Sequence, residues 1–192
     1  MNRPGIVFLD ADTLGEVDGF FELTRIGNRT VYPNPLPEQR IERIHGKEIV
    51  ITNKVVIDKE VMDASSELKL ICVAATGMNN IDLDYASHRG IAVKNVAGYS
   101  TESVVQHVFS MIFCLLGNLQ YYMNYVKEGS YTRSSLFTHH GRPYYELSGK
   151  IFGIVGMGTI GRRVAELATA FGANVIYYST SGKNLNAGFK CV

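Results

Sequence analysis

Short apolar, β-branched runs alternate along the chain with segments of helical spacing. Several of these runs are apolar at consecutive positions, which is typical of parallel strands buried on both faces. Asp58 and Asp82 stand where N-caps belong, so helices are expected over residues 59–64 and 83–89. The alternation of strand and helix predicts an α/β fold with a doubly wound parallel sheet. The predicted strands cover residues 5–9, 48–52, 69–74, 91–95, 150–156 and 174–179.

A domain boundary is predicted near residues 95–101. The long uncharged segment after it predicts one helix over 102–127. Glu at its start and Lys at its end suit the helix dipole. Polar side chains inside it, His107 and Asn118 among them, argue against a membrane span and for a buried helix. Residues 128–149 are polar and broken by Gly and Pro. This segment is predicted to be either an arm that packs on a neighbouring chain or an ordinary surface loop.

This boundary predicts two domains, residues 1–98 and residues 99–192, and the second includes the long helix. Composition supports globular domains, since 46% of the 192 residues are hydrophobic and 19% charged. A net charge of +1 predicts neither nucleic-acid nor membrane binding. The three cysteines form no CxxC pair, which predicts free thiols and no metal site. With no signal peptide visible, we expect a cytoplasmic protein.

A glycine fingerprint, Gly156-x-Gly158-x-x-Gly161, stands between a predicted strand and an amphipathic helix. The first glycine permits a tight turn, the second lets backbone N–H groups approach a pyrophosphate, and the third lets helix pack on strand. The helix N-terminus adds positive partial charge. This context predicts dinucleotide binding.

The acidic residue that usually binds the ribose of NAD is missing. Its expected place, about 20 residues further on, reads Tyr-Ser-Thr-Ser-Gly-Lys over 178–183, and no acidic residue follows Glu166. Ser179 and Lys183 could receive a 2′-phosphate instead. NAD and NADP both stay open as cofactors, with NADP favoured; a solvated loop with relaxed cofactor choice is the other reading.

Two further loops follow predicted strands, where ligands sit in open α/β sheets. Residues 75–80, Ala-Thr-Gly-Met-Asn-Asn, form a glycine-bearing turn whose N–H groups can hold a carboxylate. Residues 96–101 join a strand to the long helix, and a plain interdomain connector fits them equally well.

Residues 75–83 and 89–107, together with the glycine fingerprint, resemble the D-isomer-specific 2-hydroxyacid dehydrogenases, nearest the glycerate dehydrogenase and hydroxypyruvate reductase group. The resemblance implies a flavodoxin-like substrate domain, a Rossmann cofactor domain and a homodimer. It also implies hydride transfer between NAD(P)H and a small D-2-hydroxy acid.

The resemblance also assigns site residues. The backbone at Thr76, Gly77 and Met78 would bind the substrate carboxylate, and Tyr99 would contact the substrate. Ser103 would lie near the nicotinamide, while Thr159 and Ile160 would contact the pyrophosphate beside the three glycines. Departures from the family pattern are Asn79 for Asp, Ala97 for Pro and Gln106 for Glu.

No residue of this chain is assigned a catalytic role, because the Arg and the His–Glu pair of the family would lie further downstream. We expect His107 to be a core or interface histidine and the third Rossmann strand to be absent, so the chain should be inactive alone. A non-catalytic dinucleotide-binding module, comparable to the corepressors that resemble this family, is the alternative. A flavodoxin-like signalling domain would leave the glycine fingerprint unexplained.

Overall fold

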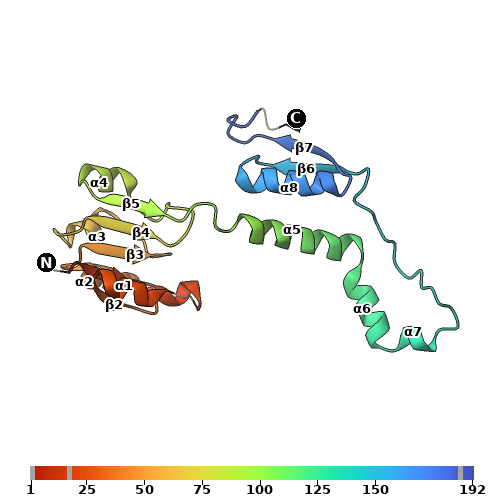
Figure 1. Cartoon of the computed structure of the whole chain (residues 1–192), viewed down its shortest axis with the longest axis horizontal. Coiled ribbons are helices and arrows are strands. Elements are labelled where there is room, and N and C mark those ends of the chain that lie inside the picture. The colour runs from red at the N-terminus through yellow and green to blue at the C-terminus, as the bar shows by residue number, and fades with distance from the viewer. Residues whose placement is uncertain (1–2, 17–18, 186–187) are drawn as a thin grey trace. The chain divides into compact units, whose positions relative to one another are not determined.

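The computed structural model describes residues 3–16, 19–185 and 188–192. The chain divides into two compact units, Met1–Ala97 (unit 1) and Gly98–Val192 (unit 2). Each unit is built on a parallel sheet with helices packed against it (Figure 1). The predicted α/β class is therefore confirmed, with a flavodoxin-like unit followed by the first strands of a Rossmann sheet.

Unit 1 holds five parallel strands in the order β2-β1-β3-β4-β5, which is the flavodoxin-like order. Four of these strands were predicted. The edge strand β2 was missed because its sequence, Asn-Arg-Thr-Val, carries no apolar run. The strands are β1 (Gly5–Phe8), β2 (Asn28–Val31), β3 (Ile49–Thr52), β4 (Leu70–Val73) and β5 (Ala92–Asn95).

The helices of unit 1 are short, and the two predicted caps are confirmed. The carboxylate of Asp58 accepts the N–H of Val61 at 3.0 Å, and that of Asp82 accepts the N–H of Tyr85 at 2.9 Å. Each cap satisfies a donor that the first helical turn leaves unpaired. The helices are α1 (Phe20–Ile26), α2 (Arg40–Ile44), α3 (Lys59–Asp63) and α4 (Leu83–His88), with 3₁₀ turns η1 (Ala11–Leu14) and η2 (Pro37–Gln39).

One face of this sheet carries the core. Val50 of β3 and Ile71 of β4 pack with Val61 of α3 and Ala86 of α4, all with no exposed surface. On the opposite face, side chains of β3 and β4 such as Cys72 are only half-buried. The expectation that the strands are buried on both faces is therefore wrong for β3 and β4.

Unit 2 has three parallel strands in the order β6-β7-β8, with α8 in contact with α5 (Figure 1). The third strand corrects the expectation that it would be absent. It has two residues, Lys-Cys, so no apolar run marks it in the sequence. The elements are α5 (Thr101–Leu116), α6 (Leu119–Lys127), α7 (Ser130–Arg133), β6 (Ile151–Val155), α8 (Thr159–Ala170), β7 (Asn174–Tyr178) and β8 (Lys190–Cys191).

The predicted single helix over 102–127 is wrong, because it breaks between α5 and α6 with a bend of 65°. Asn118 adopts a left-handed backbone with φ 49°, a conformation that a helix cannot continue through. Its side-chain amide donates to the carbonyl of Pro143 at 2.7 Å, which ties the break to the segment before β6. Among the described residues no single helix could cross a membrane; the bent pair meets that test by length and composition only.

The core of unit 2 lies between α5, α8 and one face of the sheet. The Phe109 ring of α5 lies 6.3 Å from that of Phe152 and 5.6 Å from that of Phe171. On the other face of β6, Ile151 is 72% and Val155 79% exposed. Here too only one face is buried, because no helix among residues 98–185 and 188–192 covers the second.

Gly27 offers a stability test, since a Cβ there would stand 2.4 Å from the carbonyl oxygen of Pro4. That contact is with backbone, so Gly27→Ala should lower the free energy of unfolding by about 1–3 kcal/mol. The matched control is Gly153→Ala in β6, where a Cβ meets nothing within 4 Å. It should leave stability unchanged or raise it by up to about 1 kcal/mol. Urea titration followed by circular dichroism measures both; equal effects would contradict the packing.

Candidate functional site

The turn after β4 exposes backbone donors at the carboxyl edge of the unit 1 sheet. The side-chain amide of Asn95 donates to the carbonyl of Thr76 at 2.6 Å, and the Thr76 hydroxyl donates to the carbonyl of Val96 at 3.1 Å. The N–H groups of Thr76, Gly77 and Met78 find no acceptor among the described residues. Three neighbouring donors without a partner suit a carboxylate; the assignment of these residues to a substrate carboxylate stays a prediction.

A second turn, residues 52–55 at the end of β3, lies against this one and is organised by Asp10. The Asp10 carboxylate has no exposed surface and accepts N–H bonds from three consecutive residues. The distances to Oδ2 are 3.2 Å from Asn53, 2.6 Å from Lys54 and 3.2 Å from Val55, with a second bond of 2.9 Å from Asn53 to Oδ1. These bonds replace the water that the buried carboxylate has lost.

The two turns are joined and enclose a small polar cleft. The side-chain amide of Asn80 donates to the carbonyl of Val55 at 3.0 Å, and the N–H of Ile57 donates to the carbonyl of Asn80 at 2.8 Å. The cleft measures about 190 Å³ and contains no acidic side chain among its lining residues. This second wall was not predicted, although the polar residues Thr52, Asn53 and Lys54, where the predicted strand 48–52 ends, are a usable signal. The lining residues are Asn53, Lys54, Ala75, Gly77, Asn79 and Asn80.

The glycine fingerprint of unit 2 folds as a cradle between β6 and α8. Gly156 has φ 95°, and a Cβ on Gly161 would stand 2.2 Å from the carbonyl oxygen of Gly156, so helix and turn touch backbone to backbone. A Cβ on Gly158 would meet nothing within 4 Å, which leaves open space in front of the turn. Among the described residues, the N–H groups of Thr159 and Ile160, in the first turn of α8, find no acceptor. The cradle fits a dinucleotide pyrophosphate.

The loop after β7 is held from two sides. The buried Tyr177 hydroxyl donates to the carbonyl of Asn184 at 2.7 Å, and the Arg162 guanidinium donates to the Asn184 side chain at 3.2 Å. Arg162, which the sequence analysis did not assign, therefore brings a cation from α8 to the loop that contains Ser179 and Lys183. Ser179 is half-buried and Lys183 exposed.

The remaining candidates occupy exposed positions of unit 2. Tyr99 is 65% exposed in the turn before α5, and Ser103 is exposed in the first turn of that helix. His107 is also exposed, so of the two expected positions the core one is wrong, and a position in an interface stays a prediction. No cluster of metal-binding side chains occurs among the described residues, and the three cysteines are free. Burial raises the pKa of the Cys72 thiol, which keeps it protonated.

The fold and the two turns together define a class: an α/β protein with a glycine turn of the dinucleotide-binding type in one unit and a small polar cleft in the other. Comparison with known proteins agrees. Residues 10–185 match the family described as D-isomer specific 2-hydroxyacid dehydrogenase, catalytic domain. The chain belongs to this family.

Individual relatives are distributed over several activities. The chain is 37% identical to a putative 2-hydroxyacid dehydrogenase of Haemophilus influenzae over 90% of this chain and 55% of that protein. It is 35% identical to a glycerate dehydrogenase of Methylorubrum extorquens over 74% of this chain and 45% of that one. The chain thus spans about half the length of these relatives.

Two solved structures resemble this chain closely. An acyclic imino acid reductase in complex with NADPH and D-Arg gives a TM-score of 0.80 at 26% identity, covering 98% of this chain and 60% of the other. D-Lactate dehydrogenase from Aquifex aeolicus, complexed with NAD and lactic acid, gives 0.74 at 26% identity, covering 98% and 55%. Both likenesses extend over both units of this chain.

The contact between Gly156 and Gly161 predicts a structural cost for a side chain. Gly161→Ala should push α8 away from the turn and lower the stability of unit 2 by about 1–3 kcal/mol. Gly158→Ala should be neutral, since its Cβ enters open space at φ −77°. Urea midpoints of the two variants measure this; a neutral Gly161→Ala would contradict the close approach.

Proposed function

We propose that this chain is the substrate-binding and first cofactor-binding part of an oxidoreductase that transfers hydride between NAD(P)H and a small D-2-hydroxy or 2-oxo acid. The glycerate–hydroxypyruvate pair is the proposed substrate type. The observation that carries the proposal is that two clusters of N–H groups, at 76–78 in unit 1 and at 159–160 in unit 2, have no acceptor among the described residues. Unit 1 would serve as substrate domain and unit 2 as cofactor domain.

In the proposed mechanism the N–H groups of Thr76, Gly77 and Met78 hold the substrate carboxylate. Holding the carboxylate fixes the position of the neighbouring C2 atom, at which oxidation or reduction takes place. The cradle at Gly156, Gly158 and Gly161 would hold the pyrophosphate, and the bound nicotinamide supplies or accepts the hydride. Ser103 is proposed to lie near the nicotinamide ring and Tyr99 to contact the substrate.

The proton at the substrate oxygen needs an acid–base group within hydrogen-bond distance. We assign this role to no residue of the chain, because its histidines lie outside the cleft lining. The chain alone is therefore proposed to be inactive. An assay with hydroxypyruvate, glyoxylate and pyruvate, beside a family enzyme of full length, tests this. A rate above roughly a hundredth of that enzyme's would mean that an acid–base group was overlooked.

The cradle is tested by cofactor binding. Gly158→Ala should weaken binding of NADH and NADPH by about tenfold or more, because the added methyl occupies the space through which backbone and phosphate approach. Its urea midpoint should stay that of the natural chain. Fluorescence titration with either reduced dinucleotide measures the affinity. Unchanged affinity in a folded Gly158→Ala variant would refute the cradle.

NADP is the proposed preferred cofactor, supported by Lys183 and Arg162 at the loop after β7 and by the absence of an acidic residue after Glu166. Ser179→Asp should shift preference toward NADH, because a carboxylate accepts ribose hydroxyls and repels a 2′-phosphate. Ser66→Asp in unit 1 is the charge-matched control and should change nothing. If the natural chain binds NADH ten times more tightly than NADPH, the proposed preference for NADP is wrong.

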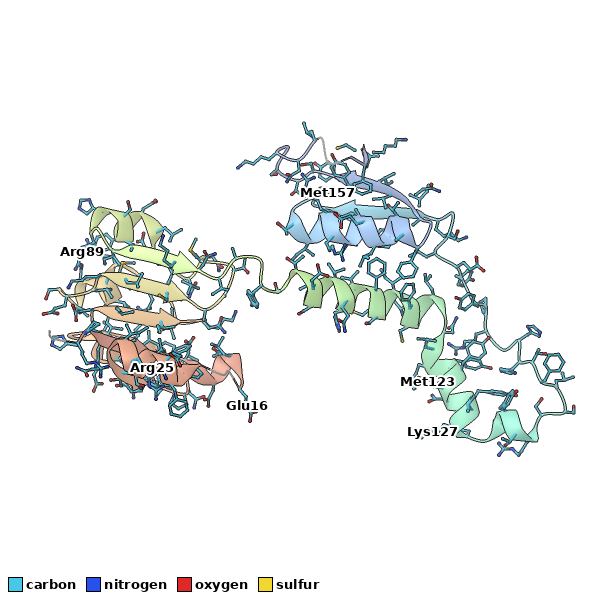
Figure 2. The ribbon with its side chains drawn as sticks, in the orientation of Figure 1. Glu16, Arg25, Arg89, Met123, Lys127 and Met157 are labelled. Atoms are coloured by element: carbon cyan, nitrogen blue, oxygen red, sulfur yellow. The ribbon has the colours of Figure 1, made fainter. Side chains whose placement is uncertain are left out.

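A homodimer through unit 2 is also proposed. Apolar side chains remain uncovered along α5, α6 and the segment before β6; Met123, on α6 in Figure 2, is 65% exposed and Phe137 is 87% exposed. Monomers rarely expose so many together. The residues concerned are Met111, Leu115, Leu119, Met123, Val126, Leu136, Phe137, Tyr144 and Tyr145.

Light scattering at micromolar concentration should give a mass of two chains. Leu115→Glu places a charge on this surface and should yield monomer, because a buried unpaired charge is costly. Phe21→Glu, at an equally exposed apolar residue of unit 1, should remain dimeric. A monomeric natural chain would rule the dimer out.

A further inference from the structure

The cleft between the turns 52–55 and 75–80 has one charged side chain in its lining, Lys54. Among the described residues, the Lys54 ammonium makes no ion pair and no hydrogen bond. Its backbone N–H is already committed to Asp10 at 2.6 Å. Lys54 therefore places an ammonium group, unpaired among the described residues, at the border of the cleft, while hydrogen bonding to Asp10 fixes its backbone.

Most other side-chain donors of the cleft are already engaged. The Asn53 amide donates to the Thr13 hydroxyl at 3.0 Å, and the Asn80 amide donates to the carbonyl of Val55 at 3.0 Å. Asn79 makes no hydrogen bond through its side chain among the described residues, but it is neutral. Lys54 is thus the strongest donor left for a bound molecule, and unlike the N–H groups at 76–78 it lies on the opposite turn.

The donors of the two facing turns therefore suit two different parts of an acid substrate. The three N–H groups beside Gly77 suit the carboxylate that every 2-hydroxy acid carries. A donor on the facing turn suits an oxygen elsewhere on the molecule. A hydrocarbon group in that place accepts no hydrogen bond from the exposed Lys54 ammonium, whereas an oxygen substituent accepts a charge-assisted one.

We propose that Lys54, on the turn that Asp10 holds, is a specificity-determining residue that selects acids with an oxygen substituent on C3 over those with a bare methyl or hydrocarbon chain. This inference rests on the proposed function, since it takes the turn at 76–78 as the carboxylate site. The Asp10 carboxylate, which accepts from the N–H groups of residues 53–55, holds the turn on which Lys54 borders the cleft.

The test compares D-glycerate with D-lactate, which differ only by the hydroxyl on C3. Titration of the isotope-labelled chain, followed by nuclear magnetic resonance of the Gly77 amide, gives an affinity for each acid. The natural chain should bind D-glycerate about tenfold or more tighter than D-lactate. Lys54→Met should remove this preference and leave D-lactate affinity within about twofold of the natural chain, whereas Lys54→Arg, which keeps the cation, should retain it.

Lys69→Met is the matched control. Lys69 is also an exposed lysine of unit 1, but it lies before β4, at the opposite edge of the sheet, where it pairs with Glu48 at 2.7 Å. It should keep the full preference for D-glycerate. Loss of the preference in Lys69→Met would show that net charge and not position is responsible, and would overturn the proposal.

The possible failures are distinguishable. If both acids shift the Gly77 amide with equal affinity, or if Lys54→Met retains the preference, the role of Lys54 is wrong while the carboxylate site stands. If neither acid shifts the Gly77 amide at any attainable concentration, the proposed carboxylate site itself is wrong, and the role of Lys54 falls with it.

Discussion

The buried carboxylate of Asp10 is the interaction on which the carboxyl edge of the unit 1 sheet depends. A carboxylate without water is unfavourable unless hydrogen bonds replace its hydration, and the N–H groups of residues 53–55 provide them. To do so, the chain must curve around the carboxylate as soon as β3 ends. That curve positions Val55, whose carbonyl accepts from Asn80, and so brings the turn 75–80 against it. The cleft follows from one buried charge.

Both units place, beyond the end of a parallel strand, N–H groups that have no acceptor among the described residues. The strands of a parallel sheet all end at one edge, so the turns that follow them gather there. In unit 1 the donors come from a turn whose carbonyl and hydroxyl groups are tied to β5 and the residue after it. In unit 2 they come from the first turn of α8, where the helix dipole adds to them. The glycine at 161 is what brings α8 close enough to the turn.

The break at Asn118 gives the first half of the predicted helix a different role from the second. Helix α5 packs its Val105 and Phe109 against α8 and shares the core of unit 2. Helix α6 has no buried residue, and its aromatic side chains contact the segment before β6: Tyr125 stacks on His139 at 3.7 Å, and the Tyr121 hydroxyl lies 2.7 Å from the His139 ring nitrogen. Bending at Asn118 thus leaves an apolar surface outside the core.

Local physics was enough for the features that the sequence predicted correctly. Three kinds of feature depend mainly on residues that are neighbours in the chain: the six apolar strands, the caps at Asp58 and Asp82, and the glycine fingerprint. The sequence pattern was therefore enough to predict them. Strand β2 has no apolar run and β8 has only two residues, and both form because a neighbouring strand pairs with them. The break at Asn118, the contact of Arg162 with the loop after β7, and the turn around Asp10 join residues far apart in the chain. Only the tertiary structure decides these, because hydrogen bonds such as Lys54 to Asp10, 44 positions apart, have no local signature.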